Sequence, residues 1–354
     1  MEKKVFGFGV IGCGLVSQFH GKAIQAAEGA KLVAAVDMVP ERAAEFAQAY
    51  GGEALSSMDA IFARDDVDVV NVLTPNAYHE EYVVKAAQAG KHVLVEKPPE
   101  MTLEKVDRMI AACEENGVQF GVVLQCRFRK AIEAIRHAME AGRFGRLLHG
   151  DAYMKWFRSK EYYAPDTWRS SREQGAGVTI QHAFHYIDLL HHLMGPVKQV
   201  QARMTNLAHP EVTLEDTVIA IMDYANGAQG VVEASTALYP GTDIRIEING
   251  ENGTAIMQGE RIIEWAFREE KPEDAAIRKI GSESIGTAAT GAADFAYFEH
   301  QYLIEDMIAA IREGRPPRIT AHDGRGSLEI ALAMYRSADE GKVVELPLSR
   351  ERGA

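Results

Sequence analysis

The fold is decided by the stretch VFGFGVIGCGLVS at residues 5–17, in which an apolar run leads into a glycine-rich turn. The run reads as a buried strand of a parallel sheet. Gly12 permits a sharp turn, and Gly14 lets the backbone approach a pyrophosphate at the N-terminus of the helix that follows. Ser17 stands where a third Gly or Ala is usual. The stretch therefore predicts the opening unit of a dinucleotide-binding domain.

An acidic residue completes this unit. Asp37 ends the next apolar strand, which runs from Leu32 to Val36, about twenty residues after Gly14. A carboxylate at this place can accept a hydrogen bond from the ribose 2′-OH, and its charge would repel a 2′-phosphate. The sequence therefore predicts NAD, in preference to NADP, as the cofactor.

The same alternation of strands and helices continues to Leu124. Further apolar strands are predicted over 67–73, 92–95 and 119–124, with helices over 42–50, 78–89 and 103–116 between them. Strands separated by helices in this rhythm form a doubly wound parallel sheet. We expect residues 1–124 to make up the NAD-binding domain.

The strand at 92–95 runs directly into Glu96-Lys97-Pro98. Pro98 cannot donate to a sheet ladder and biases Lys97 towards an extended conformation, so the strand ends there. A lysine at the carboxyl end of such a strand faces the crevice in which open α/β sheets bind ligands. A solvated lysine at a strand end is the alternative interpretation of this stretch alone.

Four motifs together resemble the Gfo/Idh/MocA oxidoreductase family, which includes inositol dehydrogenases, glucose–fructose oxidoreductase and many sugar dehydrogenases. They are the glycine-rich turn, Thr74-Pro75-Asn76-x-x-His79, the Ala89–Val93 stretch AGKHV and Glu96-Lys97-Pro98. The resemblance extends over essentially the whole chain. It implies a Rossmann domain that binds NAD, followed by an α+β domain that binds substrate and mediates oligomerisation.

The second half of the sequence changes its pattern. After a helix from about Arg127, short strands joined by turns are predicted between 147 and 267, and two amphipathic helices close the chain. Strands without covering helices on both sides indicate a large, mainly antiparallel sheet with one open face. We expect residues 125–354 to form this domain, and its open face to support a homodimer or homotetramer.

The helix expected after Gly177 carries a second similarity to the family. His185 falls on the family's catalytic histidine, and Asp188 on the acid one turn later. Gln181 stands where many members have Asp, and Ala183 replaces a Gly. The histidines of this helix lack the spacing and third group typical of metal ligands, so we expect no metal.

The resemblance assigns roles to further residues. It makes Lys97 and His185 catalytic, and it places Gln181, Arg127 and Arg169 near the substrate. The cofactor-binding residues that it implies, together with the glycine-rich turn, are Gly12, Gly14, Leu15, Val16, Asp37, Thr74, Asn76, His79, Glu96, Lys97 and Trp168.

The expected activity is oxidation of a secondary hydroxyl on a sugar, polyol or sugar acid. The substrate would transfer a hydride to the nicotinamide, while Lys97 and His185 handle the hydroxyl proton. Two rivals stay open: an NAD-dependent glycoside hydrolase that oxidises its substrate transiently, and a non-catalytic NAD-binding sensor. The presence of both Lys97 and His185 argues against the sensor.

The charge and composition of the chain limit the kinds of partner that it is expected to bind. The net charge of −13 argues against nucleic acid and anionic membranes, and no apolar run approaches the length of a membrane span. Three cysteines without framework spacing favour a reduced, cytoplasmic setting. The segment from Lys155 to Arg172 is nevertheless basic. These arginines could contact the NAD pyrophosphate or balance nearby acids, but they also suggest a substrate with a carboxylate or a diphosphate.

Overall fold

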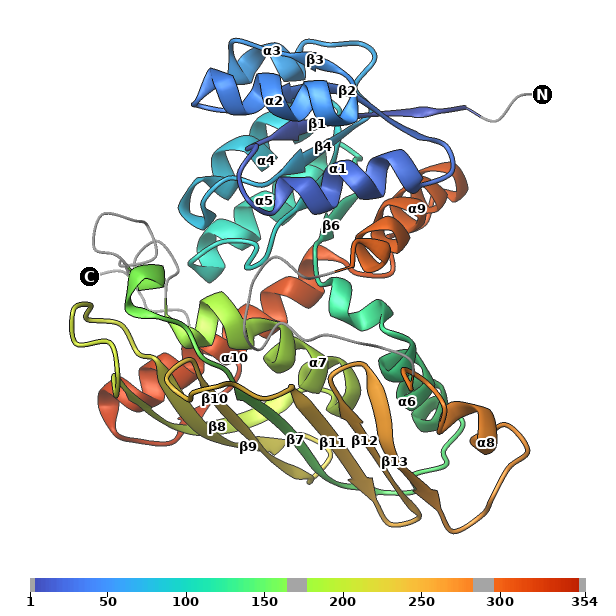
Figure 1. Ribbon diagram of the computed structural model, residues 1–354, viewed down its shortest axis with the longest axis vertical. Coiled ribbons are helices and arrows are strands. Elements are labelled where there is room, and N and C mark those ends of the chain that lie inside the picture. The colour runs from blue at the N-terminus through green and yellow to red at the C-terminus, as the bar shows by residue number, and fades with distance from the viewer. Residues whose placement is uncertain (1–3, 164–176, 283–295, 350–354) are drawn as a thin grey trace. The chain divides into compact units, whose positions relative to one another are not determined.

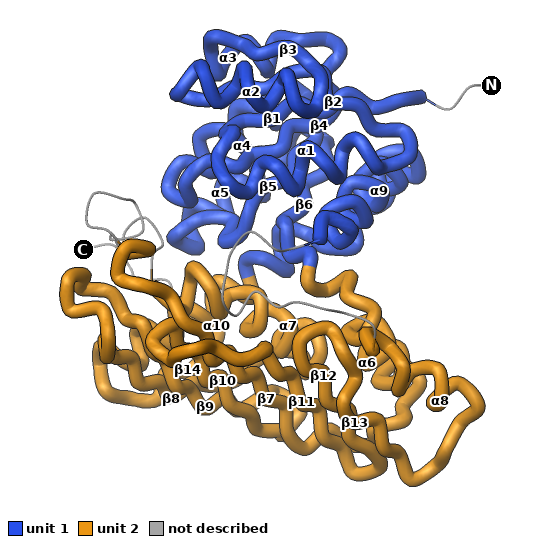
Figure 2. The backbone as a smooth tube through the Cα atoms, viewed as in Figure 1, with its two compact units in different colours: residues 1–125, 296–325 blue, residues 126–295, 326–354 orange. Residues whose placement is uncertain are grey.

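A computed structural model describes residues 4–163, 177–282 and 296–349. The chain divides into two compact units (Figure 1, Figure 2). Unit 1 comprises residues 1–125 and 296–325, and unit 2 comprises residues 126–295 and 326–354. In the described part of the chain, no helix is long and apolar enough to cross a membrane.

Unit 1 is built on a parallel sheet with the strand order β3-β2-β1-β4-β5-β6. The strand bounds are β1 Phe6–Ile11, β2 Ala30–Val36, β3 Glu53–Ala54, β4 Val69–Val72, β5 His92–Val95 and β6 Phe120–Val122. The order reverses direction at β1, so that β1 and β4 lie side by side although they are not consecutive strands. This is the topological switch point at which doubly wound sheets bind their ligands, and the predicted Rossmann architecture is confirmed.

Helices flank this sheet in Figure 1. They are α1 Ser17–Ala26, α2 Pro40–Tyr50, α3 Met58–Phe62, the 3₁₀ turn η1 Asn76–Tyr78, α4 His79–Gln88, α5 Leu103–Glu115 and α9 Phe298–Glu313. Strands β1, β2, β4, β5 and β6 are largely buried, as expected for parallel strands covered on both faces, whereas both residues of the edge strand β3 are exposed.

Helix α9 belongs to unit 1, although it follows most of unit 2 in the sequence. The sequence pattern predicts that residues 125–354 form the second domain, whereas the structure groups residues 296–325 with the Rossmann unit. The reason is apolar packing: Ile304 and Met307 belong to the same buried cluster as Phe8 of β1 and Ile24 of α1. Phe298, the first residue of α9, is 53% exposed.

Unit 2 contains a sheet with the strand order β13-β12-β11-β7-β10-β9-β8-β14. The bounds are β7 Leu147–Lys155, β8 Val197–Thr205, β9 Thr217–Tyr224, β10 Gln229–Ser235, β11 Arg245–Gly250, β12 Gly253–Gln258, β13 Arg261–Phe267 and β14 Val344–Glu345. Only the β7–β10 pair in this described sheet is parallel, which confirms the mainly antiparallel prediction.

One face of this sheet is covered by helices, and Figure 1 shows α7 and α10 along it. The helical segments are the 3₁₀ turn η2 Gln125–Phe128, α6 Lys130–Glu140, the 3₁₀ turn η3 Lys160–Tyr163, the π-helical turn η6 Thr179–Ala183, α7 Phe184–Met194, α8 Asp274–Ile277 and α10 Ala321–Glu340. On β9, burial alternates, so that Val218 and Ala220 are fully buried while Ile219 and Ile221 are about half exposed. The exposed pair lies on the face opposite to the core.

Candidate active site

The glycine-rich turn between β1 and α1 has the shape that a pyrophosphate requires. Gly12 has φ +96°, and an added Cβ would lie 2.8 Å from the Leu73 carbonyl, so only glycine fits. A Cβ on Gly14 would meet no atom within 4 Å, which leaves its side of the turn open to a ligand. Ser17 explains the departure at the third position, because its hydroxyl donates to the Gly14 carbonyl at 2.7 Å and closes the turn.

Asp37 lies beside this turn, as the sequence predicts. Its carboxylate accepts hydrogen bonds from the backbone N–H of Cys13 at 2.7 Å and from that of Val39 at 2.8 Å. These bonds fix the carboxylate at the end of β2, next to the N-terminus of α1. A carboxylate held there is positioned to receive a ribose hydroxyl, and the residues present therefore fit a dinucleotide.

The turn after β4 forms the next part of the site. Asn76 is 7% exposed, and Thr74 Oγ1 is a buried hydroxyl without a hydrogen-bond partner in the described structure. A buried hydroxyl normally finds a partner, so this atom is a candidate contact for the cofactor. The turn lies at the carboxyl end of β4, beside the switch point.

His79 ties this turn to the segment after Lys97. Its Nε2 lies 2.9 Å from the Thr74 carbonyl, and its Nδ1 lies 3.1 Å from the carbonyls of Pro98 and Pro99. Burial lowers the pKa of His79, against the opposing effect of these carbonyls, so the ring is neutral and donates on one side. His79 thus joins two loops that the sequence assigned to the cofactor.

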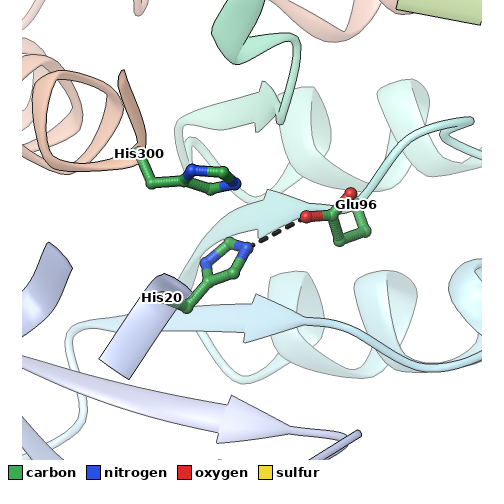
Figure 3. Close-up of side chains that lie close together, drawn as sticks. All are labelled: His20, Glu96 and His300. Carbon is green, nitrogen blue, oxygen red and sulfur yellow. Dashed lines mark hydrogen bonds and ion pairs between the residues drawn. The ribbon is translucent and has the colours of Figure 1, made fainter. Parts of the chain in front are cut away.

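Glu96 directs its carboxylate inwards from the end of β5. Oε2 accepts from the backbone N–H of Lys97 at 3.0 Å, and Oε1 lies 3.0 Å from Nε2 of His20 (Figure 3). Burial alone would raise the pKa of Glu96, but the hydrogen bond with His20 and the neighbouring His20, His300 and Lys97 lower it to about 2. Glu96 is therefore a buried, ionised carboxylate, and each of its two oxygens has a hydrogen-bond partner.

Sequence analysis did not single out His20 or His300. Both are buried, and their rings meet edge to face at 5.1 Å, with donor atoms that lie within 4.8 Å of each other and of Glu96. The hydrogen bond between His20 and Glu96 joins two of the atoms that a metal ion would use. The position of His20 in the first turns of α1 is the signal that the sequence offered.

In unit 2, the predicted residues gather around η6 and the start of α7. Gln181 and His185 are partly exposed, whereas His182 is buried, with Nε2 3.3 Å from the Tyr162 hydroxyl and its ring against Trp156. The sequence predicted an ordinary helix here. A π-helical turn is rare and is frequently found at functional sites.

Glu215 holds the beginning of this turn. Its carboxylate accepts from the backbone N–H of Thr179 at 3.0 Å and from the Tyr335 hydroxyl at 2.7 Å. Burial raises the pKa of Glu215, and these two donors oppose that shift. Gly177 is required next to it, because it has φ +102° and a Cβ there would lie 2.5 Å from a Glu215 oxygen.

Arg127 and Asp188 form a buried pair. The guanidinium donates through Nε at 2.9 Å and through a terminal nitrogen at 2.6 Å to the two oxygens of Asp188, and the Ser327 hydroxyl donates to the same carboxylate at 2.8 Å. Arg127 is 5% exposed and Asp188 1%. These bonds fix α7 one turn after His185.

Two predicted residues, Trp168 and Arg169, lie outside the described residues. Of the basic segment that contains them, Lys155 pairs with Glu233 at 3.1 Å. The Arg158 guanidinium is buried, with its carbon 4.9 Å from the centre of the Trp156 ring. Both cations therefore interact with side chains of unit 2, Lys155 with a carboxylate and Arg158 with an aromatic ring.

Comparisons with known proteins agree with this geometry. The profile of the Gfo/Idh/MocA oxidoreductase family, described as an NAD-binding Rossmann fold, matches residues 6–124, and that of the family's C-terminal domain matches residues 132–256. The crystal structure of the WlbA dehydrogenase from Bordetella pertussis in complex with NADH and UDP-GlcNAcA is 34% identical, with TM-score 0.90 over 99% of this chain and 100% of that one.

Curated relatives share less of the sequence. The inositol 2-dehydrogenase of Rhizobium meliloti is 28% identical over 96% of this chain and 98% of its own. The 2,7-anhydro-N-acetylneuraminate hydratase of Mediterraneibacter gnavus is 26% identical over 97% of both chains. The chain belongs to the Gfo/Idh/MocA family of NAD-binding oxidoreductases.

Proposed function

We propose that this enzyme oxidises a secondary hydroxyl group of a sugar or sugar acid and reduces NAD. The observation that carries the proposal is Lys97, which stands at the carboxyl end of β5 in a sheet whose first turn fits a dinucleotide. The support from relatives is the NADH complex of the WlbA dehydrogenase, at 34% identity over nearly the full length of both chains.

Bound NAD supplies the hydride acceptor. Lys97 hydrogen-bonds the reacting oxygen and stabilises its alkoxide character, and His185 accepts the hydroxyl proton. Because both groups can carry or release a proton, the two roles can be shared between them. Gln181, four residues before His185, contributes an amide rather than a carboxylate to the substrate side.

The remaining predicted residues fall into two groups, those that contact the cofactor and one that positions a helix. Gly12, Gly14, Leu15, Val16 and Asp37 contact the cofactor around the first turn, and Thr74 and Asn76 contact it from the second. The two-pronged bond of Arg127 to Asp188 supports a positioning role for Arg127, which fixes α7 rather than binding substrate directly.

We further propose that the substrate carries a negative charge, such as a uronate carboxylate or a nucleotide diphosphate. The WlbA dehydrogenase binds UDP-GlcNAcA, which contains a diphosphate, and the sequence between Lys155 and Arg172 is basic. A uronate should then have a lower KM than its neutral parent sugar, and the advantage should shrink as salt is added. If the neutral sugar has the lower KM at both ionic strengths, this part of the proposal is wrong.

The test of the activity is a panel of inositols, aldoses, uronates and UDP-linked sugars, each supplied with NAD, with NADH absorbance as the readout. At least one compound should give NADH in proportion to ketone product. The hydratase relative favours one competing outcome, in which product forms without net NADH. Product analysis on the same samples distinguishes a redox-neutral reaction from dehydrogenation.

The same proposal includes a homo-oligomer in the cytoplasm. Ile219 and Ile221, both about half exposed on β9, give the open face of the unit 2 sheet an apolar centre that a second copy can cover. Three buried free cysteines suit a reducing compartment. Sedimentation should show a dimer or tetramer that Ile221→Glu dissociates, and a single 38.9 kDa species for the wild type would contradict this.

A further inference from the structure

The backbone of Lys97 is held by a side chain that comes from the residue before it. Glu96 Oε2 accepts from the Lys97 N–H at 3.0 Å, and the Glu96 N–H itself donates to the Val72 carbonyl at 3.0 Å. The carboxylate therefore folds back beneath the strand end instead of pointing into solvent. Any rotation of the Glu96 side chain would release the Lys97 N–H.

A buried histidine determines the orientation of that carboxylate. Nε2 of His20 lies 3.0 Å from Glu96 Oε1, and its Nδ1 lies 3.0 Å from the Asn71 side-chain amide, which can donate to it. With Nδ1 accepting from Asn71, Nε2 carries a proton and donates to Glu96. Asn71, His20, Glu96 and the Lys97 backbone thus form one chain of hydrogen bonds, and the first three residues are each at most 8% exposed.

We propose that His20 and Glu96 are positioning residues for Lys97: Glu96 fixes its backbone and places a negative charge beside its amine, and His20 locks Glu96 in place. The inference rests on the proposed function only in that Lys97 acts on the substrate. A buried ionised carboxylate without a strong donor would be costly, and the hydrogen bond from His20 offsets that cost.

Several titratable groups surround this chain of bonds and bear on any pH profile. From α1, the start of α4, the segment around β5 and α9 they are His20, His79, Glu96, Lys97, Glu100 and His300. His300 differs from His20. Its ring stacks on Phe19 and meets the His20 ring edge to face, and its Nδ1 has no hydrogen-bond partner among the described residues. We therefore assign His300 a packing role only.

The test compares four variants. His20→Ala removes the donor, His20→Gln restores an amide donor of similar reach, Glu96→Gln keeps the shape and removes the charge, and His300→Phe keeps the ring packing. His20→Ala should lower kcat about tenfold to a hundredfold, because small misplacements of a reacting group have effects of that size. NAD affinity should change less than about threefold, and His20→Gln should recover most of the loss, as expected for an effect that acts through Glu96.

A second readout works without any substrate. The rate at which the Lys97 amine is reductively methylated, followed by peptide mass spectrometry across pH, reports its protonation. Glu96→Gln should move the midpoint of this profile to lower pH by about one unit, because the adjacent negative charge is gone. If no sugar is oxidised by the wild type, the proposed function fails while this profile still tests the positioning proposal.

The outcomes separate clearly. An unchanged kcat in His20→Ala, or a methylation midpoint that does not move in Glu96→Gln, would overturn the proposal. So would a loss of kcat in His20→Ala that His20→Gln does not restore, since that indicates a general structural effect. His300→Phe should retain kcat, and if it instead loses activity together with a stoichiometric metal ion found in the wild type, the cluster is a metal site.

Discussion

Lys97 and His185, to which we assign the chemistry, are held in different ways. Lys97 follows β5, the strand next to the edge strand β6 of the parallel sheet, and its turn is bonded by Glu96, the residue before it. His185 follows a π-helical turn whose start is fixed by Glu215, a residue far along the chain. The backbone at Lys97 is thus bonded by the neighbouring residue, and the helix start before His185 by a residue 36 positions away, although Glu96 itself depends on the distant His20.

This difference suggests how one fold serves many substrates. The bond between Glu96 and the Lys97 N–H can keep the lysine backbone in a constant arrangement as long as His20 holds the Glu96 carboxylate. A helix start that depends on remote side chains can be altered by changes elsewhere in unit 2. On the proposed function, substrate choice would then vary through unit 2 while the hydride chemistry is retained.

The largest effects should come from the two reacting groups themselves. Lys97→Ala and His185→Ala should each lower kcat by about 10²–10⁴-fold, the usual contribution of a general acid or base. The Kd for NAD should stay nearly constant in both. Stopped-flow or steady-state NADH formation and fluorescence titration of NADH measure these quantities, and near-wild-type turnover in either variant would remove that residue from the mechanism.

A substitution at Gly177 tests the dependence of the helix start before His185 on Glu215. Gly177→Ala places a Cβ 2.5 Å from the Glu215 carboxylate at φ +102°, and should destabilise the protein by about 1–3 kcal/mol. Gly142→Ala is the matched control, because Gly142 also has positive φ, at +68°, but an added Cβ meets nothing within 4 Å. Thermal unfolding and kcat should both change more for Gly177→Ala, and equal effects would mean that the Glu215 contact is unimportant.

The buried histidines of unit 1 predict a pH dependence of stability. Burial lowers the pKa of His300 from 6.5 to about 3, so below pH 6.5 the unfolded chain binds a proton that the folded chain does not. Stability should therefore fall as the pH drops, by about 2 kcal/mol at pH 5 from this group alone. Denaturant unfolding at pH 5 and pH 7 measures it, and His300→Phe should reduce the difference. A difference that persists unchanged in the variant would assign the effect to other groups.

The smallest predicted effect concerns the choice of cofactor. Asp37→Ser removes the charge that faces a 2′-phosphate, and should narrow the preference for NAD over NADP by about tenfold in kcat/KM. Two backbone N–H groups are bonded to the Asp37 carboxylate, so part of the change will be a looser turn at Cys13 and Val39. Equal kcat/KM values of the wild type with NAD and with NADP would show that Asp37 does not discriminate between the two cofactors at the ribose 2′ position.

Most elements could be predicted because each depends on a short segment. The strands of unit 1 and the hairpin of β9 and β10 follow from apolar runs and turn residues. The strands Glu53–Ala54 and Val344–Glu345 were not predicted, since two residues are too few to show a period. Helix α6 begins at Lys130 rather than Arg127, because a 3₁₀ turn over Gln125–Phe128 precedes it.

Among the site residues, too, those that follow from a short segment could be predicted, and those with distant partners could not. Gly12, Asp37 and Lys97 could be proposed from the sequence because spacing along the chain reflects their geometry. His20 could not, since its partner Glu96 is 76 residues away, and neither could Tyr335, which is 120 residues from Glu215. The apolar pattern of α9 predicted a packed helix but not that it packs in unit 1, because the pattern does not specify a partner.

The central proposal is that Lys97 and His185 act in one reaction. A double-mutant cycle on kcat tests it most directly, with Lys97→Ala, His185→Ala and the double variant compared on one substrate. If both serve the same proton transfer, the double variant should lose little more than the worse single variant, because groups that act as a unit are strongly non-additive. Losses that multiply in the double variant would show that the two residues act independently and would contradict the account.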